Sequence, residues 1–170
     1  MKLIEEIDKC HCKRTLSKQR KASRGIIFVG DKLLLIQSQK YQEYKFPGGG
    51  VKEHEYLKQA LIREVLEETG YDVVSDSIKE YGKIVERHID SFDSTRVFEQ
   101  TSYYFLCDVV DNKKQQSLDD YEKEYGYEIK IVDVDEAIKQ NELVKNSGPD
   151  WIEREITMLK YIKKDILNRK

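Results

Sequence analysis

FPGGGVKEHEYLKQALIREVLEETGY, residues 46–71, joins a glycine-rich segment to a helical pattern. Leu57, Leu61 and Val65 recur at four-residue steps, which predicts a helix over about residues 55–69. Gly70 then follows at a position where a left-handed residue commonly ends a helix. Residues 46–50 are expected to be irregular, because proline lacks an amide donor and consecutive glycines weaken regular structure.

Three carboxylates gather on one face of the predicted helix. Glu64, Glu67 and Glu68 are three and four residues apart, and such neighbours are adjacent on a helix. Their mutual repulsion favours a bound cation, and oxygen donors without Cys or His suit Mg²⁺ or Mn²⁺ rather than zinc. The preceding glycines let a phosphate approach the backbone, and a helix N-terminus attracts anions. The pattern indicates metal-assisted phosphate chemistry, whereas a solvated, salt-bridged helix face is the structural alternative.

Residues 49–71 resemble the Nudix box, G-x5-E-x7-R-E-U-x-E-E-x-G-U, in which U is a bulky apolar residue. The fixed identities of the box all stand at the required spacing: Gly49, Glu55, Arg63, Glu64, Glu67, Glu68 and Gly70. Tyr71 is a more polar choice for the last apolar position. The resemblance implies a Nudix fold, an α+β arrangement (α/β/α sandwich) with a mixed β-sheet between helices and the box as loop–helix–loop.

The resemblance also implies roles for individual residues. Glu64, Glu67 and Glu68 correspond to metal ligands, and the carbonyl of Gly49 can join them. Glu64 also corresponds to the residue that assists or positions the attacking water. Arg63 corresponds to the residue that orients the glutamates. These four side chains, Arg63 and the three glutamates, are therefore the expected catalytic residues.

The implied activity is that of a Mg²⁺-dependent (or Mn²⁺-dependent) pyrophosphohydrolase. Its substrate would be a nucleoside diphosphate linked to another moiety, or a nucleoside triphosphate, cleaved at a phosphoanhydride bond by metal-assisted water attack. A catalytically silent Nudix domain that binds or senses a ligand is the alternative. Such modules usually lose a box carboxylate, and here the box carboxylates are complete.

Further substrate contacts are expected outside the acidic helix. Gly48 and Gly49 form the turn before it, and Arg24, near the start of the first expected strand, can reach a phosphate. The alternative for Arg24 is an arginine at a sheet edge. Family members often recruit an acidic residue from a loop beyond the box, and Glu122 and Glu124 are the candidates, although loop carboxylates are usually only solvated.

The flanks of the box predict a mixed sheet covered by helices. Strands are expected at residues 25–29, 32–37, 71–74, 77–86 and 127–134, and residues 97–110 are expected to contain a strand at 101–107. Helices are expected from about 135 and 149, and a polar loop at 111–126. Residues 1–21 are expected to be a polar, basic segment outside a Nudix domain that spans residues 22–168. Of Tyr103 and Tyr104, one is expected in the core and the other in a base pocket; Trp151 is expected to pack under the last helix, and His88 to be structural.

Composition limits the partners and the location. The net charge of -2 from mixed charges gives no argument for nucleic-acid binding, so a small nucleotide-type substrate is expected. No apolar run approaches the roughly 20 residues that span a membrane, and residues 1–6 lack the apolar stretch of a secretory signal. Three cysteines, an odd and sparse set, are not a disulfide framework, which favours a cytoplasmic location. The sequence leaves homodimerisation open.

Overall fold

The computed structural model describes residues 1–10, 16–90, 93–111 and 115–168. Its largest sheet has five strands in the order β1-β8-β9-β2-β6, namely Leu3–Asp8 (β1), Lys79–Ile89 (β8), Val97–Leu106 (β9), Leu16–Ile26 (β2) and Gly48–Gly50 (β6). β1 runs parallel to β8, and β2 runs parallel to β9. The pairs β8–β9 and β2–β6 are antiparallel. The sheet is therefore mixed, as the sequence predicts.

The other strands form two smaller sheets. One has the order β11-β4-β3, namely Tyr127–Val132 (β11), Lys32–Ser38 (β4) and Phe28–Val29 (β3), and Tyr44–Lys45 (β5) also pairs with β4. The expected hairpin is present, since β3 and β4 pair antiparallel around Gly30. The other small sheet pairs Tyr71–Val73 (β7) with Val109–Asp111 (β10).

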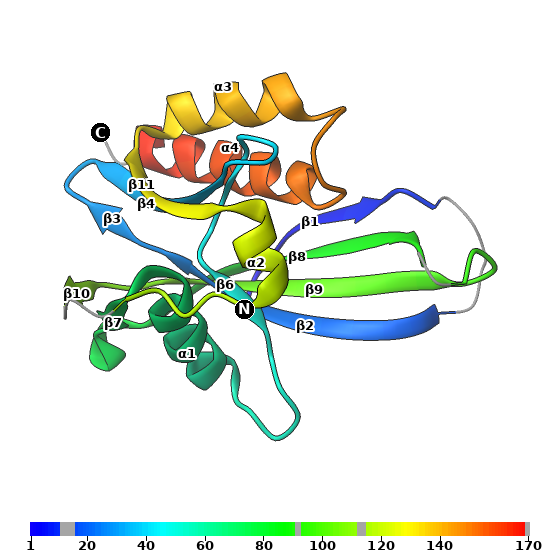
Figure 1. Ribbon diagram of the computed structural model, residues 1–170, viewed down its shortest axis with the longest axis horizontal. Helices are drawn as coiled ribbons and strands as arrows, with labels where there is room; N and C mark the ends of the chain where they lie inside the picture. The colour runs from blue at the N-terminus through cyan, green and yellow to red at the C-terminus, as the bar shows by residue number, and fades with distance from the viewer. Residues whose placement is uncertain (11–15, 91–92, 112–114, 169–170) are drawn as a thin grey trace.

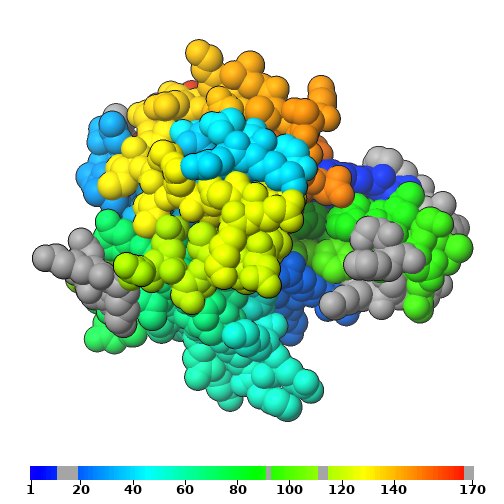
Figure 2. Space-filling model, viewed as in Figure 1, coloured from blue at the N-terminus to red at the C-terminus, as the bar shows by residue number. Residues whose placement is uncertain are grey.

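Helices lie on both sides of the strands (Figure 1). The helix of the box, Leu57–Thr69 (α1), lies on one side, and Val134–Val144 (α3) and Ile152–Asn168 (α4) lie on the other. Two short helices, Ser75–Ser77 (η1) and Asp120–Tyr125 (α2), complete the described elements. Figure 2 shows the loop between β6 and α1, residues 51–56, projecting at the lower edge of the molecule. The arrangement confirms the expected α/β/α layers. None of the described helices is long and apolar enough to cross a membrane.

Two hydrophobic cores fill the spaces between these layers. Ile26, Leu33, Leu35 and Tyr104 face the core beneath α3 and α4. Their chain neighbours Ile27, Leu34 and Phe105 face the core beneath α1. Successive side chains of a strand point to opposite faces of the sheet. These strands are apolar on both faces because helices cover both faces.

The apolar spacing of the box produces α1 as predicted. Ala60, Leu61 and Val65 are buried beneath the helix. Gly70 ends it in the left-handed conformation with φ 72°, and its amide donates to the carbonyl of Leu66 at 2.8 Å. The helix begins at Leu57, two residues after the expected start.

The glycines before the helix are not irregular, which corrects the expectation for residues 48–50, whereas residues 46 and 47 are irregular as expected. Gly48–Gly50 form β6, whose partners on β2 run from Arg24 opposite Gly48 to Ala22 opposite Gly50. Gly48 has φ 137°, and a Cβ there would lie 2.7 Å from the Cα of Arg24. Glycine is therefore required at residue 48 because the two backbones approach so closely.

The described parts of the N-terminal segment belong to the main sheet, which corrects the boundary expected between residues 21 and 22. β1 pairs with β8, β2 already begins at Leu16, and Ile4 and Ile7 pack against the first core. The charged residues of β1 obscured this strand in the sequence. Three further boundaries differ: residues 25–29 divide between β2 and β3, residues 97–110 divide between β9 and β10, and the loop expected at 111–126 contains α2.

Candidate active site

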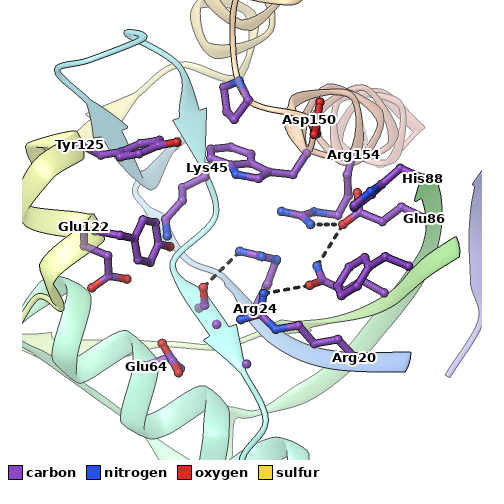
Figure 3. A pocket seen from close by; sticks show the side chains of 18 of the residues that line it. Arg20, Arg24, Lys45, Glu64, Glu86, His88, Glu122, Tyr125, Asp150 and Arg154 are labelled. Atoms are coloured by element: carbon purple, nitrogen blue, oxygen red, sulfur yellow. Dashed lines mark hydrogen bonds and ion pairs between the residues drawn. The ribbon is translucent and has the colours of Figure 1, made fainter. Parts of the chain in front are cut away.

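A cavity of about 620 Å³ opens between the main sheet, α1, α2 and the start of α4. Figure 3 shows Glu64 and Glu122 on one side of it and Glu86, His88 and Arg154 on the other. β6 brings its three glycines, Gly48–Gly50, to the same cavity. The box and the residues outside it therefore converge on one space.

Glu64 is the box glutamate that lines this cavity. Its Oε1 accepts a hydrogen bond from Nη1 of Arg63 at 2.5 Å. A Cβ at residue 49 would collide with the carboxylate of Glu64, so the glycine is what allows this acid to lie against β6. Burial raises the pKa of Glu64 above its usual value, and the neighbouring carboxylates of Glu68 and Glu67 add to that increase against the opposing effect of Arg63.

Arg63 ties the projecting loop to the helix. Its Nε and Nη2 donate to the two carboxylate oxygens of Glu55, both at 2.8 Å, and Nη2 also donates to the carbonyl of Gly50 at 3.0 Å. Hydrogen bonds from Arg63 lower the pKa of Glu55 to about 2. The same guanidinium reaches Glu67 through Nη1 at 3.2 Å. Arg63 is therefore placed to orient the glutamates, with Glu55 as its anchor.

Glu67 and Glu68 occupy different environments on α1. The side chain of Glu67 is 40% exposed, whereas that of Glu68 is 1% exposed. Glu68 accepts hydrogen bonds from Nζ of Lys45 at 2.6 Å and from the amide of Gly48 at 2.7 Å. Glu68 thus holds β6 beside the helix, and the three glutamates do not form one uniform face.

The structure separates the two loop candidates. Glu122 is buried and lines the cavity, and it forms a reciprocal N-terminal cap of α2 with Asp119. Burial and then the nearby carboxylate of Glu68 raise the pKa of Glu122 to about 7. Glu124 is not among the residues that line the cavity, and it forms an ion pair with Lys40 at 2.7 Å. The structure therefore does not bring Glu124 to the site.

Two arginines of β2 give the cavity a positive floor. Arg24 is buried, and its Nη1 donates to the carbonyls of Phe46 and Gly48 at 3.3 and 3.1 Å. Arg20 donates to Oε1 of Gln100 at 3.2 Å. Among the described residues, no carboxylate forms an ion pair with either arginine, and Nε of Arg24 has no hydrogen-bond partner. Since β2 lies between β9 and β6, Arg24 is not an edge residue.

The aromatic residues of the cavity differ from those expected. Tyr103 packs against the core beneath α1 and Tyr104 lies in the other core, so the base pocket expected for one of them is wrong. Trp151 lines the cavity. His88 and Phe98 also line it, and the ring centres of these two residues are 4.9 Å apart. Further aromatic rings come from α2 and the start of β11: Tyr121, Tyr125 and Tyr127. The capping pattern of Asp119 and Glu122 was the sequence signal that could have revealed α2.

The donor groups around Glu64 are oxygen atoms, which are the ligands that a hard divalent cation prefers. Glu64, Glu67 and the carbonyl of Gly49 supply oxygen donors, and burial, followed by the neighbouring carboxylates of Glu68 and Glu67, raises the pKa of Glu64. Within the described ranges, no three acidic, His or Cys side chains already converge as a metal cage. Arg63 engages Glu64 and Glu67 through Nη1 alone, so it can release both acids while Nε and Nη2 stay on Glu55.

A glycine strand set against an acidic helix, on a mixed sheet between helices, defines the Nudix class of fold. The model of the NUDIX domain matches residues 19–154. The chain therefore belongs to the NUDIX domain family.

Solved structures of the family share the fold. A NUDIX hydrolase from Nitrosomonas europaea aligns with a TM-score of 0.61 and 20% identity, over 86% of this chain and 90% of that chain. A MutT NUDIX hydrolase from Burkholderia pseudomallei aligns with a TM-score of 0.52 and 18% identity, over 70% and 86% of the two chains. The mMutator MutT protein from Bacillus halodurans gives 0.50 and 18%, over 71% and 72%. No curated protein matches the sequence significantly.

Proposed function

We propose that this protein is a Mg²⁺-dependent hydrolase that cleaves a phosphoanhydride bond in a small nucleotide. The observation that carries this proposal is that acidic and basic side chains line different walls of one cavity. Glu64 and Gly49 lie on one wall, and Arg20 and Arg24, without carboxylate partners among the described residues, lie on another. Hydrolysis of a diphosphate needs both kinds of group: cationic side chains that bind the phosphate oxygens, and carboxylates that bind a divalent ion and position a water.

The position of each residue in the cavity determines its proposed role. Arg24 and Arg20 bind phosphate oxygens, for which guanidinium geometry is well suited. Glu64 accepts the proton of the attacking water or orients that water, because it is the box acid that faces the cavity. Arg63 keeps Glu64 in place, and Glu68 fixes β6 through the amide of Gly48.

Mg²⁺ or Mn²⁺ would be held by Glu64, Glu67 and the carbonyl of Gly49. The bound ion would supply positive charge that polarises the diphosphate and favours ionisation of the attacking water. Glu68 lies beside these ligands and supports them indirectly, since its carboxylate oxygens already accept hydrogen bonds from Lys45 and the amide of Gly48. Glu122 remains a candidate for the further acid, since it lines the cavity.

The proposed substrate is a nucleoside diphosphate linked to another moiety, or a nucleoside triphosphate, and not a nucleic acid. The acidic groups in and around the cavity argue against binding a long polyanion. A cytoplasmic location remains our proposal, because three cysteines are an odd and sparse set that gives no disulfide framework.

A phosphate-release screen over nucleotide sugars, dinucleotides and nucleoside triphosphates tests this function. With Mg²⁺ present we expect hydrolysis of at least one class, and we expect chelation with EDTA to lower that rate by about 100-fold or more. A protein that binds nucleotides but releases no phosphate with Mg²⁺ or Mn²⁺ would instead be the catalytically silent binding module.

A further inference from the structure

The main sheet arranges the cavity residues in rows along its strands. On β2 and β9, Arg24 lies opposite Tyr104, and Arg20 lies opposite Gln100. On β8 and β9, Gln100 lies opposite Glu86, and the next row on the same face pairs His88 with Phe98. The rows therefore lead from the glycine strand to the arginines and then to a pair of aromatic rings.

The spacing of these rows suits an elongated substrate. Strands rise about 3.3 Å per residue, so the row of Arg20 lies about 13 Å from that of Arg24. The row of His88 and Phe98 lies two residues farther, or about 7 Å. A group held at this end is thus separated from Glu64 by the two arginines that we assign to phosphates.

Trp151 approaches the same end from the helical layer. Its ring centre lies 5.8 Å from the guanidinium carbon of Arg154. Arg154 donates to Glu86 at 2.5 Å, and Gln100 donates to Glu86 at 3.0 Å. This chain of contacts places Trp151 next to the row of Glu86 and Gln100, across the cavity end from the sheet. Figure 3 shows Arg154, Glu86 and His88 together at this end.

We propose that Trp151, His88 and Phe98 form a stacking slot for the nucleobase of the substrate. This inference rests on the proposed function and adds to it the residues that would hold the base of the nucleotide. The polar groups of the adjoining sheet row already bond to one another, since Gln100 bonds Arg20 and Glu86, and Glu86 bonds Arg154. The slot therefore recognises the base through its flat face, and each stacked ring contributes to affinity.

The fluorescence of Trp151 tests the slot directly, because this is the single tryptophan of the chain. Titration with ADP and GDP in EDTA is expected to change the emission of Trp151 saturably. Pyrophosphate and ribose 5-phosphate, which lack a base, are expected to leave the emission unchanged at the same concentrations. An equal change with pyrophosphate, or no response to either nucleotide, would overturn the slot.

Phe98→Leu separates stacking from general apolar contact. We expect it to weaken ADP binding, measured by equilibrium dialysis, about tenfold, while Phe98→Tyr restores wild-type affinity. Phe28→Leu is the matched control, since Phe28 is on β3 and outside this cavity. Circular dichroism checks that each variant is folded. Wild-type affinity in folded Phe98→Leu would contradict the slot.

The two proposals can fail separately. If Trp151 ignores nucleotides while Mg²⁺-dependent phosphate release occurs, the slot is wrong and the hydrolase stands. If ADP binds in the slot but no nucleotide is hydrolysed, the slot stands and the hydrolase is wrong.

Discussion

Glu64→Gln is expected to lower kcat/KM about 100-fold or more in the presence of Mg²⁺, with the fold intact. The substitution keeps the size of the side chain but removes its charge and its ability to accept a proton. Proton transfer by a positioned side chain contributes about 10²–10⁴-fold to a rate. Glu64 is the box acid that lines the cavity, so no other box glutamate is placed to replace it there. Steady-state kinetics on the substrate found in the screen measure the effect.

Glu53→Gln is the matched control for this variant. The side chain of Glu53 is 89% exposed and lies in the loop before α1, so its loss should leave kcat/KM within about twofold. Near-normal turnover in Glu64→Gln would show that the assignment of Glu64 is wrong. Equal losses in both variants would show that the effect does not come from the cavity.

Arg154→Met is expected to lower the free energy of unfolding by about 3–5 kcal/mol. Arg154 is 2% exposed and joins Glu86 on β8 to Glu155 on α4, with Nη2 at 2.7 Å from the carboxylate of Glu155. Glu155 in turn accepts the amide of Phe46 at 2.9 Å, just before β6. Removing the guanidinium leaves two carboxylates buried without their cation. Urea unfolding followed by circular dichroism measures the loss.

Lys160→Met provides the comparison on the same helix. Lys160 pairs with Glu142 at 2.5 Å, but its side chain is 52% exposed. Exposed ion pairs contribute about 0–1 kcal/mol, so a loss above that range is not expected. Similar losses in Arg154→Met and Lys160→Met would contradict the structural role that burial gives to Arg154.

The helix of the box was predictable because its signals are local. Leu57, Leu61 and Val65 set the apolar face, and Gly70 supplies the left-handed end. The fixed spacing from residue 49 to residue 70 also carried the family resemblance. Which glutamate faces the cavity was not predictable, because Lys45 draws Glu68 away through a contact between distant parts of the chain.

The incorrect predictions concern segments whose structure depends on pairing with distant parts of the chain. Gly48–Gly50 become a strand because β2 lies beside them, although glycines alone predict no strand. Residues 3–8 join the sheet through β8, which is distant in the sequence. The approach of Trp151 to the row of Glu86 depends on how α4 packs, and periodicity carries no such information. Pairs of buried charges such as Arg154 and Glu155 likewise cannot be distinguished from surface charges in a sequence.

The central claim is that Glu64 binds a divalent cation at the wall of the cavity formed by β6. Anomalous diffraction from crystals of the full chain soaked in Mn²⁺ tests it most directly. We expect a Mn²⁺ peak within coordination distance of Glu64 and the carbonyl of Gly49, with Arg63 still bound to Glu55. A map with no peak there, in which Glu64 keeps its bond to Arg63, would contradict the account.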